Sequence, residues 1–429
     1  MKFINNSNFN LCKKWLFLGL CALSVSGILS IIIVLLRLPF FKALLYSYNN
    51  IFDISLVIHV NLSVLVWMCS IIAIISNLII NNNTNTRFLH YLWILSFCGT
   101  ILMILSAFMP NTVAIKNNYI PVIDNCTFFI GLWLFLLSIT LNSILSVQYS
   151  NCNKHVIFTG VKGIAIMFIT VIACFIIAYT TIDKTSDNLL FYENLFWGGG
   201  HLLQAVFSQA LLIVYLIMIN KKLLHISKVV FYINTISVIF AVFSYALYPI
   251  TSPSLVNFFT WHMRVAEGII PIFLIVLVLY NIKSLIKYHN HHLLCSVILF
   301  TYGGILGIMS INGTVTIPAH YHGSIVGMTI AFMGFLYWLI PKLNLCQVNI
   351  HLSNCQIYIY SIGQFLHITG LQILGGYGAL RKVTYLPNTV SVLAKICFAF
   401  GGITAIIGGC LFVIILLRIY YKNTSKIYN

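Results

Sequence analysis

Long apolar stretches alternate with short polar breaks along the whole chain. The stretch Trp15–Leu36 carries no charged residue, and about 20 apolar residues are enough to cross a bilayer as an α-helix. Unpaired backbone polar groups are too costly in lipid, so each stretch should be helical. The expected spans are 15–36, 54–80, 89–109, 122–148, 157–181, 191–219, 228–250, 257–282, 293–312, 315–340, 356–376 and 391–418.

This pattern predicts an all-α integral membrane protein with about twelve transmembrane helices in one bundle. The polar breaks, such as 81–87 and 183–188, are too short to hold another domain, so residues 1–429 should form a single membrane domain. The chain is 60% hydrophobic and only 7% charged, whereas a soluble domain carries about 25% charged residues. A soluble globular protein and a disordered chain are therefore excluded.

Two compositional features exclude further classes. The net charge is +17, but the basic residues are scattered between apolar stretches, so a nucleic-acid-binding patch is not expected. The twelve Cys lie mostly within apolar stretches and form no Cys-x-x-Cys pair. They should be small buried side chains rather than a disulfide framework or a thiolate metal site.

The loop cations predict the orientation in the membrane. Loops on one side of the twelve spans carry fourteen Lys and Arg, and loops on the other side carry six, namely Arg37, Lys42, Lys116, Lys184, Arg381 and Lys382. Because the cytoplasmic side is the one enriched in Lys and Arg, both termini should be cytoplasmic.

In this topology, five of the thirteen His lie at a similar depth below the outer membrane surface. His59, His201, His262, His320 and His322 each lie in the first half of an even-numbered span, within one to three turns of the outer surface. Ionisable side chains inside a membrane are rare and indicate function. The remaining His lie in loops or singly along helices and should be solvated or hydrogen-bonded; these are His90, His155, His225, His289, His291, His292, His351 and His367.

The spacing of His320 and His322 is informative. Two residues along a helix turn by about 200°, so the two imidazoles point to opposite faces and cannot share one metal ion. Each can ligate a separate metal on its own side of the helix, and neutral imidazole suits haem iron and copper.

These residues resemble motifs of subunit I of the haem–copper oxidase superfamily, nearer its nitric oxide reductase and cbb-type branches. The resemblance covers nearly the whole chain. The matching segments are His59-Val60-Asn61-Leu62 with Val66-Trp67, Trp197-Gly198-Gly199-Gly200-His201, Ala319-His320-Tyr321-His322-Gly323 with Tyr337-Trp338-Leu339-Ile340-Pro341, and Gly375-Gly376-Tyr377-Gly378-Ala379-Leu380-Arg381-Lys382.

The resemblance implies a role for each motif. His59 and His322 would ligate a low-spin haem, and His320 a high-spin haem. His201 and His262 would hold one copper ion. Arg381 and Lys382 would pair with haem propionates, and Arg37 is expected at the same outer edge; ordinary loop cations are the alternative for this group.

The chain also departs from the family pattern near the expected copper. The family has two adjacent His where this chain reads Trp261-His262, and tryptophan cannot ligate a metal. Four residues after His201, where many oxidases have a tyrosine and nitric oxide reductases a glutamate, the chain has Ala205. The copper ion is therefore the least certain cofactor, and no catalytic residue is assigned beyond the centre near His201, His262 and His320.

Few groups are available for proton transfer. Glu267 is the only carboxylate well inside a span, and with Arg264 it predicts a buried ion pair at i, i+3. Tyr245 and Tyr248 precede His262 and are expected to be core or interface aromatics. Proton pumping from the inner side is not supported.

The sequence thus favours a terminal respiratory oxidase subunit in the plasma membrane, with its metal sites toward the outer face. It would pass electrons from the low-spin haem to the high-spin haem and copper, where O2 is reduced. A separate subunit, resembling subunit II or a cytochrome c, would deliver the electrons. The alternatives are a nitric oxide reductase-like chain, a degenerate haem-binding subunit without copper chemistry, and a twelve-helix secondary transporter.

Overall fold

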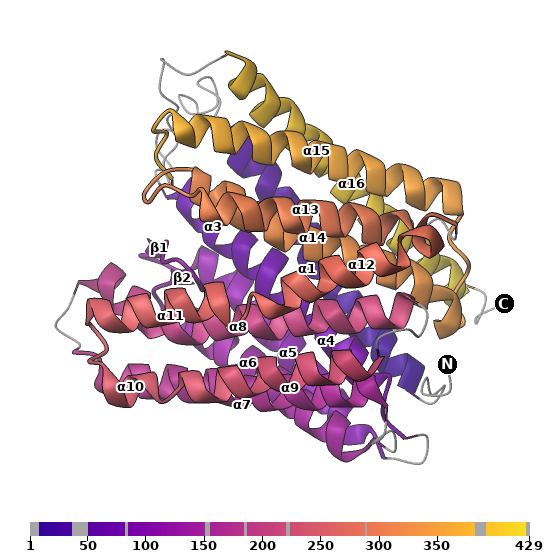
Figure 1. Ribbon diagram of the computed structural model, residues 1–429, viewed down its shortest axis with the longest axis horizontal. Coiled ribbons are helices and arrows are strands. Elements are labelled where there is room, and N and C mark those ends of the chain that lie inside the picture. The colour runs from indigo at the N-terminus through magenta and orange to yellow at the C-terminus, as the bar shows by residue number, and fades with distance from the viewer. Residues whose placement is uncertain are drawn as a thin grey trace. The chain divides into compact units, whose positions relative to one another are not determined.

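The computed structural model describes residues 8–36, 50–81, 85–150, 155–183, 187–219, 224–287, 290–381 and 392–425. Within these ranges, twelve helical segments are long and apolar enough to cross a membrane (Figure 1). The predicted fold class and number of spans are therefore confirmed. The chain divides into two compact units, Met1–Ser26 with Tyr48–Phe273, and Gly27–Ser47 with Leu274–Asn429.

The first unit contains most of the helices. It begins with the first part of α1 (Phe9–Leu35) and ends with the first residues of α12 (Ile269–Lys287). Between them lie α3 (Ile51–Val60), the π-helix η2 (Asn61–Val66), α4 (Trp67–Asn77), α5 (Arg87–Leu105), the 3-10 helix η3 (Ser106–Phe108), α6 (Cys126–Gln148), α7 (Val156–Thr181), α8 (Asn188–Met218), α9 (Leu224–Ala241), α10 (Ser244–Leu247) and α11 (Pro253–Val265).

A short antiparallel hairpin precedes α6. Its strands are β1 (Ala114–Ile115) and β2 (Val122–Ile123), with Ala114 opposite Ile123. The fourth span was expected to begin at residue 122, but its helix begins at Cys126 because Asn125 caps it, accepting a 2.9 Å hydrogen bond from the Phe128 backbone N–H. The residues just before the cap are therefore left to pair as β2.

The eighth span is interrupted within the membrane. Helix α11 ends at Val265 and α12 begins at Ile269. The backbone N–H groups of Ala266 and Glu267 both donate to the His262 carbonyl, at 2.8 and 3.2 Å. Because of this break, the side chain of Glu267 points toward His262.

The second unit contains the remaining helices. They are the rest of α1 and of α12, α13 (His291–Ile308), α14 (Thr316–Leu339), the 3-10 helix η4 (Ile340–Leu343), α15 (Ile350–Gly376) and α16 (Val392–Ser425). Helices α13, α14, α15 and α16 pack on one another in chain order.

Glycines let neighbouring helices approach closely in both units. A Cβ atom placed on Gly99 of α5 would lie 2.6 Å from the Gly131 carbonyl oxygen of α6, and the reverse substitution gives the same distance. In the second unit, a Cβ on Gly303 of α13 would lie 2.6 Å from the carbonyl carbon of Gly323 on α14. Small residues of this kind allow backbones to pack tightly where lipid provides no hydrophobic driving force.

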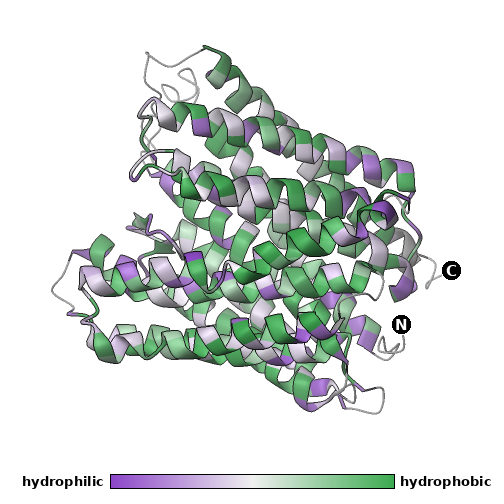
Figure 2. Ribbon diagram, in the orientation of Figure 1, coloured by the Kyte–Doolittle hydropathy of each residue, from purple (hydrophilic) through white to green (hydrophobic). Residues whose placement is uncertain are grey.

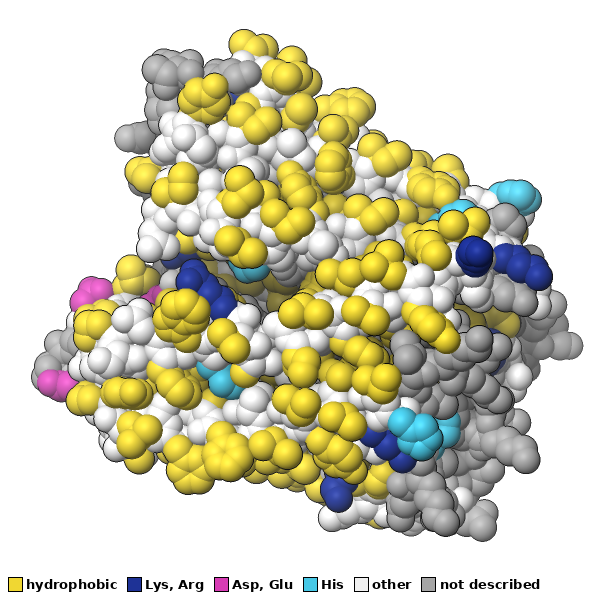
Figure 3. Space-filling model, in the orientation of Figure 1, with side chains coloured by type: hydrophobic (Ala, Val, Ile, Leu, Met, Phe, Trp, Pro, Cys, Tyr) yellow, Lys and Arg dark blue, Asp and Glu magenta, His cyan; other side chains and the backbone are white. Residues whose placement is uncertain are grey.

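The outer surface is suited to lipid. Apolar residues predominate along the helices in Figure 2, and hydrophobic side chains are spread over the described part of the face shown in Figure 3, where few charged ones appear. Exposed apolar side chains recur along the spans, for example Ile176 at 52% and Val276 at 50% exposure. Helices that are apolar on every side are typical of membrane spans.

The close packing of α5 on α6 predicts the effect of adding one methyl group. Ala is favoured over Gly within a helix by about 1 kcal/mol, but overpacking costs about 1–3 kcal/mol. Gly99→Ala should therefore lower the thermal unfolding temperature in detergent. Gly27→Ala is the matched control because its Cβ would meet nothing within 4 Å, and it should leave that temperature unchanged or raise it. Equal unfolding temperatures for both variants would contradict this packing.

Candidate functional site

The structure fixes the ring of His59 through helix α1. The Nδ1 atom of His59 lies 2.9 Å from both the carbonyl and the hydroxyl oxygen of Ser26, and that hydroxyl also lies 3.2 Å from the His59 carbonyl. Since a carbonyl only accepts, we assign the proton to Nδ1, which leaves the lone pair on Nε2. Hydrogen bonds of this kind orient metal-ligating imidazoles.

The π-helix η2 follows His59 directly. π-bulges widen a helix locally and are frequent at functional sites. Its first residue, Asn61, is 2% exposed and donates from Nδ2 to the carbonyls of Val57 at 2.9 Å and Pro121 at 2.7 Å. The second span is thereby joined to the loop of the β1–β2 hairpin.

His201 lies on α8 with both ring nitrogens in hydrogen bonds. Its Nδ1–H donates to the Trp197 carbonyl at 2.8 Å, and its Nε2 accepts from the hydroxyl of Tyr119 at 2.6 Å. The ring centroids of Tyr119, Trp197 and Phe259 lie 4.5, 5.0 and 6.0 Å from that of His201. The residue is 1% exposed, so it is enclosed by aromatic rings.

The three glycines before His201 make room for these rings. A Cβ on Gly198 would lie 2.7 Å from the Phe259 ring, one on Gly199 would overlap the Phe175 ring, and one on Gly200 would overlap Tyr119. The glycine run that the sequence linked to a metal ligand therefore serves the packing of aromatic side chains around His201.

His262 lies on α11 and is paired within its own unit. Its Nε2–H donates to the Ser237 carbonyl of α9 at 3.1 Å, and its Nδ1 lies 3.4 Å from Oε1 of Glu267. The side chains of His262 and Glu267 are 8% and 5% exposed. Among the described residues, neither this Nδ1 atom nor Oε1 of Glu267 has a hydrogen-bond partner, so the hydrogen bond that holds the imidazole is the one to the Ser237 carbonyl.

The predicted Arg264–Glu267 ion pair is wrong. The helix ends at Val265, so Glu267 turns back toward His262, while the Arg264 guanidinium lies over the exposed Trp261 ring at 5.8 Å. Trp261 is 62% exposed and points away from the interior. The side chains of Tyr245 and Tyr248 pack against Phe259 and Phe258, with ring centroids 5.6 and 6.3 Å apart, as expected of core or interface aromatics.

In the second unit, His320 is oriented in the same way as His59. Its Nδ1–H donates to the Gly303 carbonyl of α13 at 2.7 Å, which leaves the lone pair on Nε2. A Cβ on Gly307 would lie 2.6 Å from this Nδ1 atom. Glycine at that position therefore admits the ring between α13 and α14.

His322 lies on another face of α14, beside a His that the sequence did not single out. Its ring stacks on Tyr321, with centroids 5.3 Å apart, and meets the ring of His367 edge-on at 5.6 Å. The Nδ1–H of His367 donates to the Phe398 carbonyl of α16 at 2.9 Å. Nothing in the spacing of His367 indicated this neighbour, because α15 and α14 meet only through tertiary packing.

Arg381 follows α15 in a loop that is pinned to the loop before α14. Its backbone N–H donates to the Gly313 carbonyl at 3.1 Å, and Leu380 forms a β-bridge with Thr314. Gly313 and Gly378 have positive φ angles of 78° and 82°, which glycine accepts without strain. Arg381 therefore lies at the end of the unit where α14 begins, and Lys382 and Arg37 fall outside the described residues.

Haem and copper differ in how well these side chains suit them. The rings of His59 and His320 each direct Nδ1 to a backbone carbonyl, the tautomer in which an imidazole ligates haem iron through Nε2. The predicted copper pair does not fit as arranged, because both nitrogens of His201 and the Nε2 of His262 are in hydrogen bonds to protein groups. Within the described ranges, no three or more His, Cys, Asp or Glu side chains are grouped to hold a metal ion.

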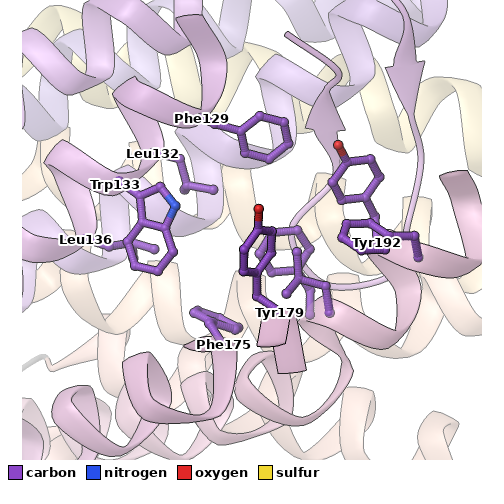
Figure 4. Close-up of a pocket in the computed structure, with 10 residues that line it drawn as sticks. Phe129, Leu132, Trp133, Leu136, Phe175, Tyr179 and Tyr192 are labelled. Atoms are coloured by element: carbon purple, nitrogen blue, oxygen red, sulfur yellow. The ribbon is translucent and has the colours of Figure 1, made fainter. Parts of the chain in front are cut away.

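A separate cavity lies among α6, α7 and α8. It measures about 340 Å³ and is lined by aromatic and aliphatic side chains, including Phe129, Trp133 and Tyr179 (Figure 4). The ring of Tyr192 stacks on Phe129 at 5.6 Å, and its hydroxyl donates to Asp124 at 2.7 Å. None of the predicted ligands lines this cavity.

Comparisons with known proteins identify the family of the chain. The sequence model of the family described as "Cytochrome C and Quinol oxidase polypeptide I" matches residues 10–410. An uncharacterized protein of Rickettsia prowazekii (strain Madrid E) is 32% identical over 497 aligned positions, covering 95% of each chain. An uncharacterized protein of Aquifex aeolicus (strain VF5) is 25% identical over 343 positions, covering 77% of this chain and 84% of its own.

The fold is also similar to that of a solved protein. A cryo-EM structure of a heme-copper terminal oxidase dimer superposes with a TM-score of 0.69 and 16% sequence identity. The match covers 96% of this chain and 84% of the other. At this identity the likeness establishes the shared fold.

The close fit of His320 against Gly307 generates a prediction. Gly307→Ala should displace the ring from the Gly303 carbonyl and weaken any metal bound at His320 by about tenfold, as loss of an orienting hydrogen bond does. Haem titration of the purified variant, followed by absorbance, measures this change. Gly304→Ala is the control because its Cβ would meet nothing within 4 Å; equal affinities in the two variants would refute the role given to Gly307.

Proposed function

The chain belongs to the cytochrome c and quinol oxidase polypeptide I family, that is, haem–copper oxidase subunit I, and from this premise we propose that it is a haem-binding respiratory subunit that reduces O2. His59 and His322 ligate a low-spin haem, and His320 ligates a high-spin haem. The observation that carries the proposal is that His59 and His320 both donate from Nδ1 to a backbone carbonyl, at 2.9 and 2.7 Å. Family membership also sets aside a secondary transporter.

The protein side chains have distinct tasks in this proposal. When bound, haem supplies reversible one-electron iron chemistry that no side chain provides. The carbonyls of Ser26 and Gly303 hold the two imidazoles in the tautomer that presents Nε2. Arg381 and Lys382 pair with propionate carboxylates, and such charge-assisted bonds are strong away from water.

The proposal also includes the orientation of the chain in the membrane and its electron-delivering partner. Both termini face the cytoplasm, and the metal sites lie toward the outer face of the plasma membrane, as the distribution of Lys and Arg favours. Electrons arrive from a separate subunit that carries its own redox group. The proposal includes no proton pumping, because Glu267 is the only carboxylate well inside a span and it is paired with His262.

Haem content tests the ligand assignment. The purified protein should contain about two haems per chain, and His59→Ala should remove the low-spin absorbance bands while keeping the high-spin ones. His351→Ala is the matched control, because that residue is exposed at the start of α15 and plays no part in the proposal. A protein without haem absorbance, or a His59→Ala variant with unchanged low-spin bands, would overturn the assignment.

Oxygen consumption tests the reaction. His320→Ala should abolish O2 uptake by membranes supplied with an artificial electron donor, while the low-spin bands stay reducible. The reason is that the variant loses the only proposed ligand of the high-spin haem. An oxygen electrode measures the rate, and uptake at the wild-type level in this variant would show that O2 is not reduced at His320.

A further inference from the structure

The strongest observation beyond the proposed function concerns the two side chains that the family uses for copper. The geometry points to a centre without copper, in which the Tyr119 hydroxyl occupies Nε2 of His201 and the Ser237 carbonyl occupies Nε2–H of His262. This inference deepens the proposed function, because it specifies the metals of the same chain. It rests on the hydrogen bonds of His201 and His262 and on the anchoring of the loop that carries Tyr119.

The first argument is the short contact at His201. A metal ion would have to lie about 2.0 Å from Nε2, yet the Tyr119 oxygen already lies 2.6 Å from that atom. No ion fits between them, so copper would require Tyr119 to leave. The other nitrogen is not available either, because Nδ1–H donates to the Trp197 carbonyl of the preceding helical turn at 2.8 Å.

The second argument is that Tyr119 is held in place by its neighbours along the loop. Lys116 pairs with Asp53 of α3 at 2.8 Å, and the backbone N–H of Asn118 donates to Glu193 of α8 at 3.0 Å. The amide of Asn118 also donates to the same carboxylate. These bonds restrain the segment that carries Tyr119.

The other side of the loop is restrained as well. The Pro121 carbonyl accepts from the buried Asn61 side chain at 2.7 Å. Residues on both sides of Tyr119 are therefore attached to helices of the same unit. Moving the backbone of this segment would break several of these bonds together, each worth about 1 kcal/mol and more where a charge takes part.

The third argument is the orientation of His262. Its Nε2–H donates to the Ser237 carbonyl at 3.1 Å, so this nitrogen has no lone pair for a metal shared with His201. Its Nδ1 lies 3.4 Å from Oε1 of Glu267, and neither of these two atoms has a hydrogen-bond partner in the part of the chain that the structure describes. The residue before it offers no replacement, since Trp261 is 62% exposed beneath the Arg264 guanidinium. The two imidazoles are thus oriented by different protein groups.

Copper quantitation on the intact haem-loaded protein tests this inference. The protein is produced in copper-supplemented cells that also make a copper-containing member of the family as a positive control. We expect less than about 0.1 copper per chain, because hydrogen bonds occupy both nitrogens of His201 and the Nε2 of His262 and a site that lacks two imidazole ligands has little affinity, while iron stays at the haem level. About one copper per chain that is lost in His201→Ala or His262→Ala would overturn the inference. Copper retained in both variants is bound elsewhere and agrees with it.

The hydrogen bond itself can be observed independently. The ultraviolet resonance Raman spectrum of Tyr119→Phe is subtracted from that of the wild type, which isolates the bands of Tyr119. We expect these bands to be those of a tyrosine that donates a strong hydrogen bond. The same subtraction in a His201→Ala background should no longer show that hydrogen bond. Tyr248→Phe, whose ring packs on Phe258, is the control and should give the same difference in both backgrounds. A Tyr119 signal that is the same with and without His201 would refute the hydrogen bond between Tyr119 and His201.

These outcomes are distinct from those of the proposed function. Absence of haem would end the proposal of a haem redox subunit but would not alter the state of Tyr119. Copper bound at His201 would end the present inference and leave the haem ligands untouched.

Discussion

An imidazole inside an apolar helix bundle must find an acceptor for its N–H group, and this constraint organises the candidate site. His59, His262, His320 and His367 each donate to a backbone carbonyl of another helix, at Ser26, Ser237, Gly303 and Phe398, and His201 donates to its own helix at Trp197. A buried donor without an acceptor costs about 1–3 kcal/mol. Each bond therefore fixes a ring and its tautomer, and the four bonds between helices also fix the contact between two helical segments.

These bonds depend on how closely the helices approach. His320 reaches the Gly303 carbonyl because glycines at 303 and 323 bring α13 against α14, and because Gly307 leaves space for the ring. A larger side chain at any of these positions would separate the backbones or displace the imidazole. These glycines thus determine how closely the helices pack, and the packing decides which carbonyl the imidazole can reach. The positions of the His in the sequence do not by themselves determine which ring nitrogen is left to bind a metal.

The sequence predicted the twelve spans because apolar length is a local property, and it identified His59 and His320 because imidazoles at one depth stand out in an uncharged background. It did not predict Tyr119, which lies in a loop and reaches His201 from 82 positions away. It also placed Glu267 with Arg264, because a continuous helix was assumed where α11 ends at Val265. Loop contacts, helix breaks and the pairing of His367 with His322 arise from tertiary structure, which spacing does not encode.

The side chains around His201 and His262 form one arrangement. Trp261 is exposed and cannot ligate a metal, and a buried imidazole nitrogen needs a hydrogen-bond partner where no metal is bound. The Tyr119 hydroxyl supplies the proton that His201 Nε2 accepts, and the Glu267 carboxylate faces His262 Nδ1. Two of the six acidic residues, Asp53 and Glu193, anchor the loop that carries Tyr119. In a chain so poor in carboxylates, their placement around this loop indicates that the enclosure of His201 is a built feature of the fold.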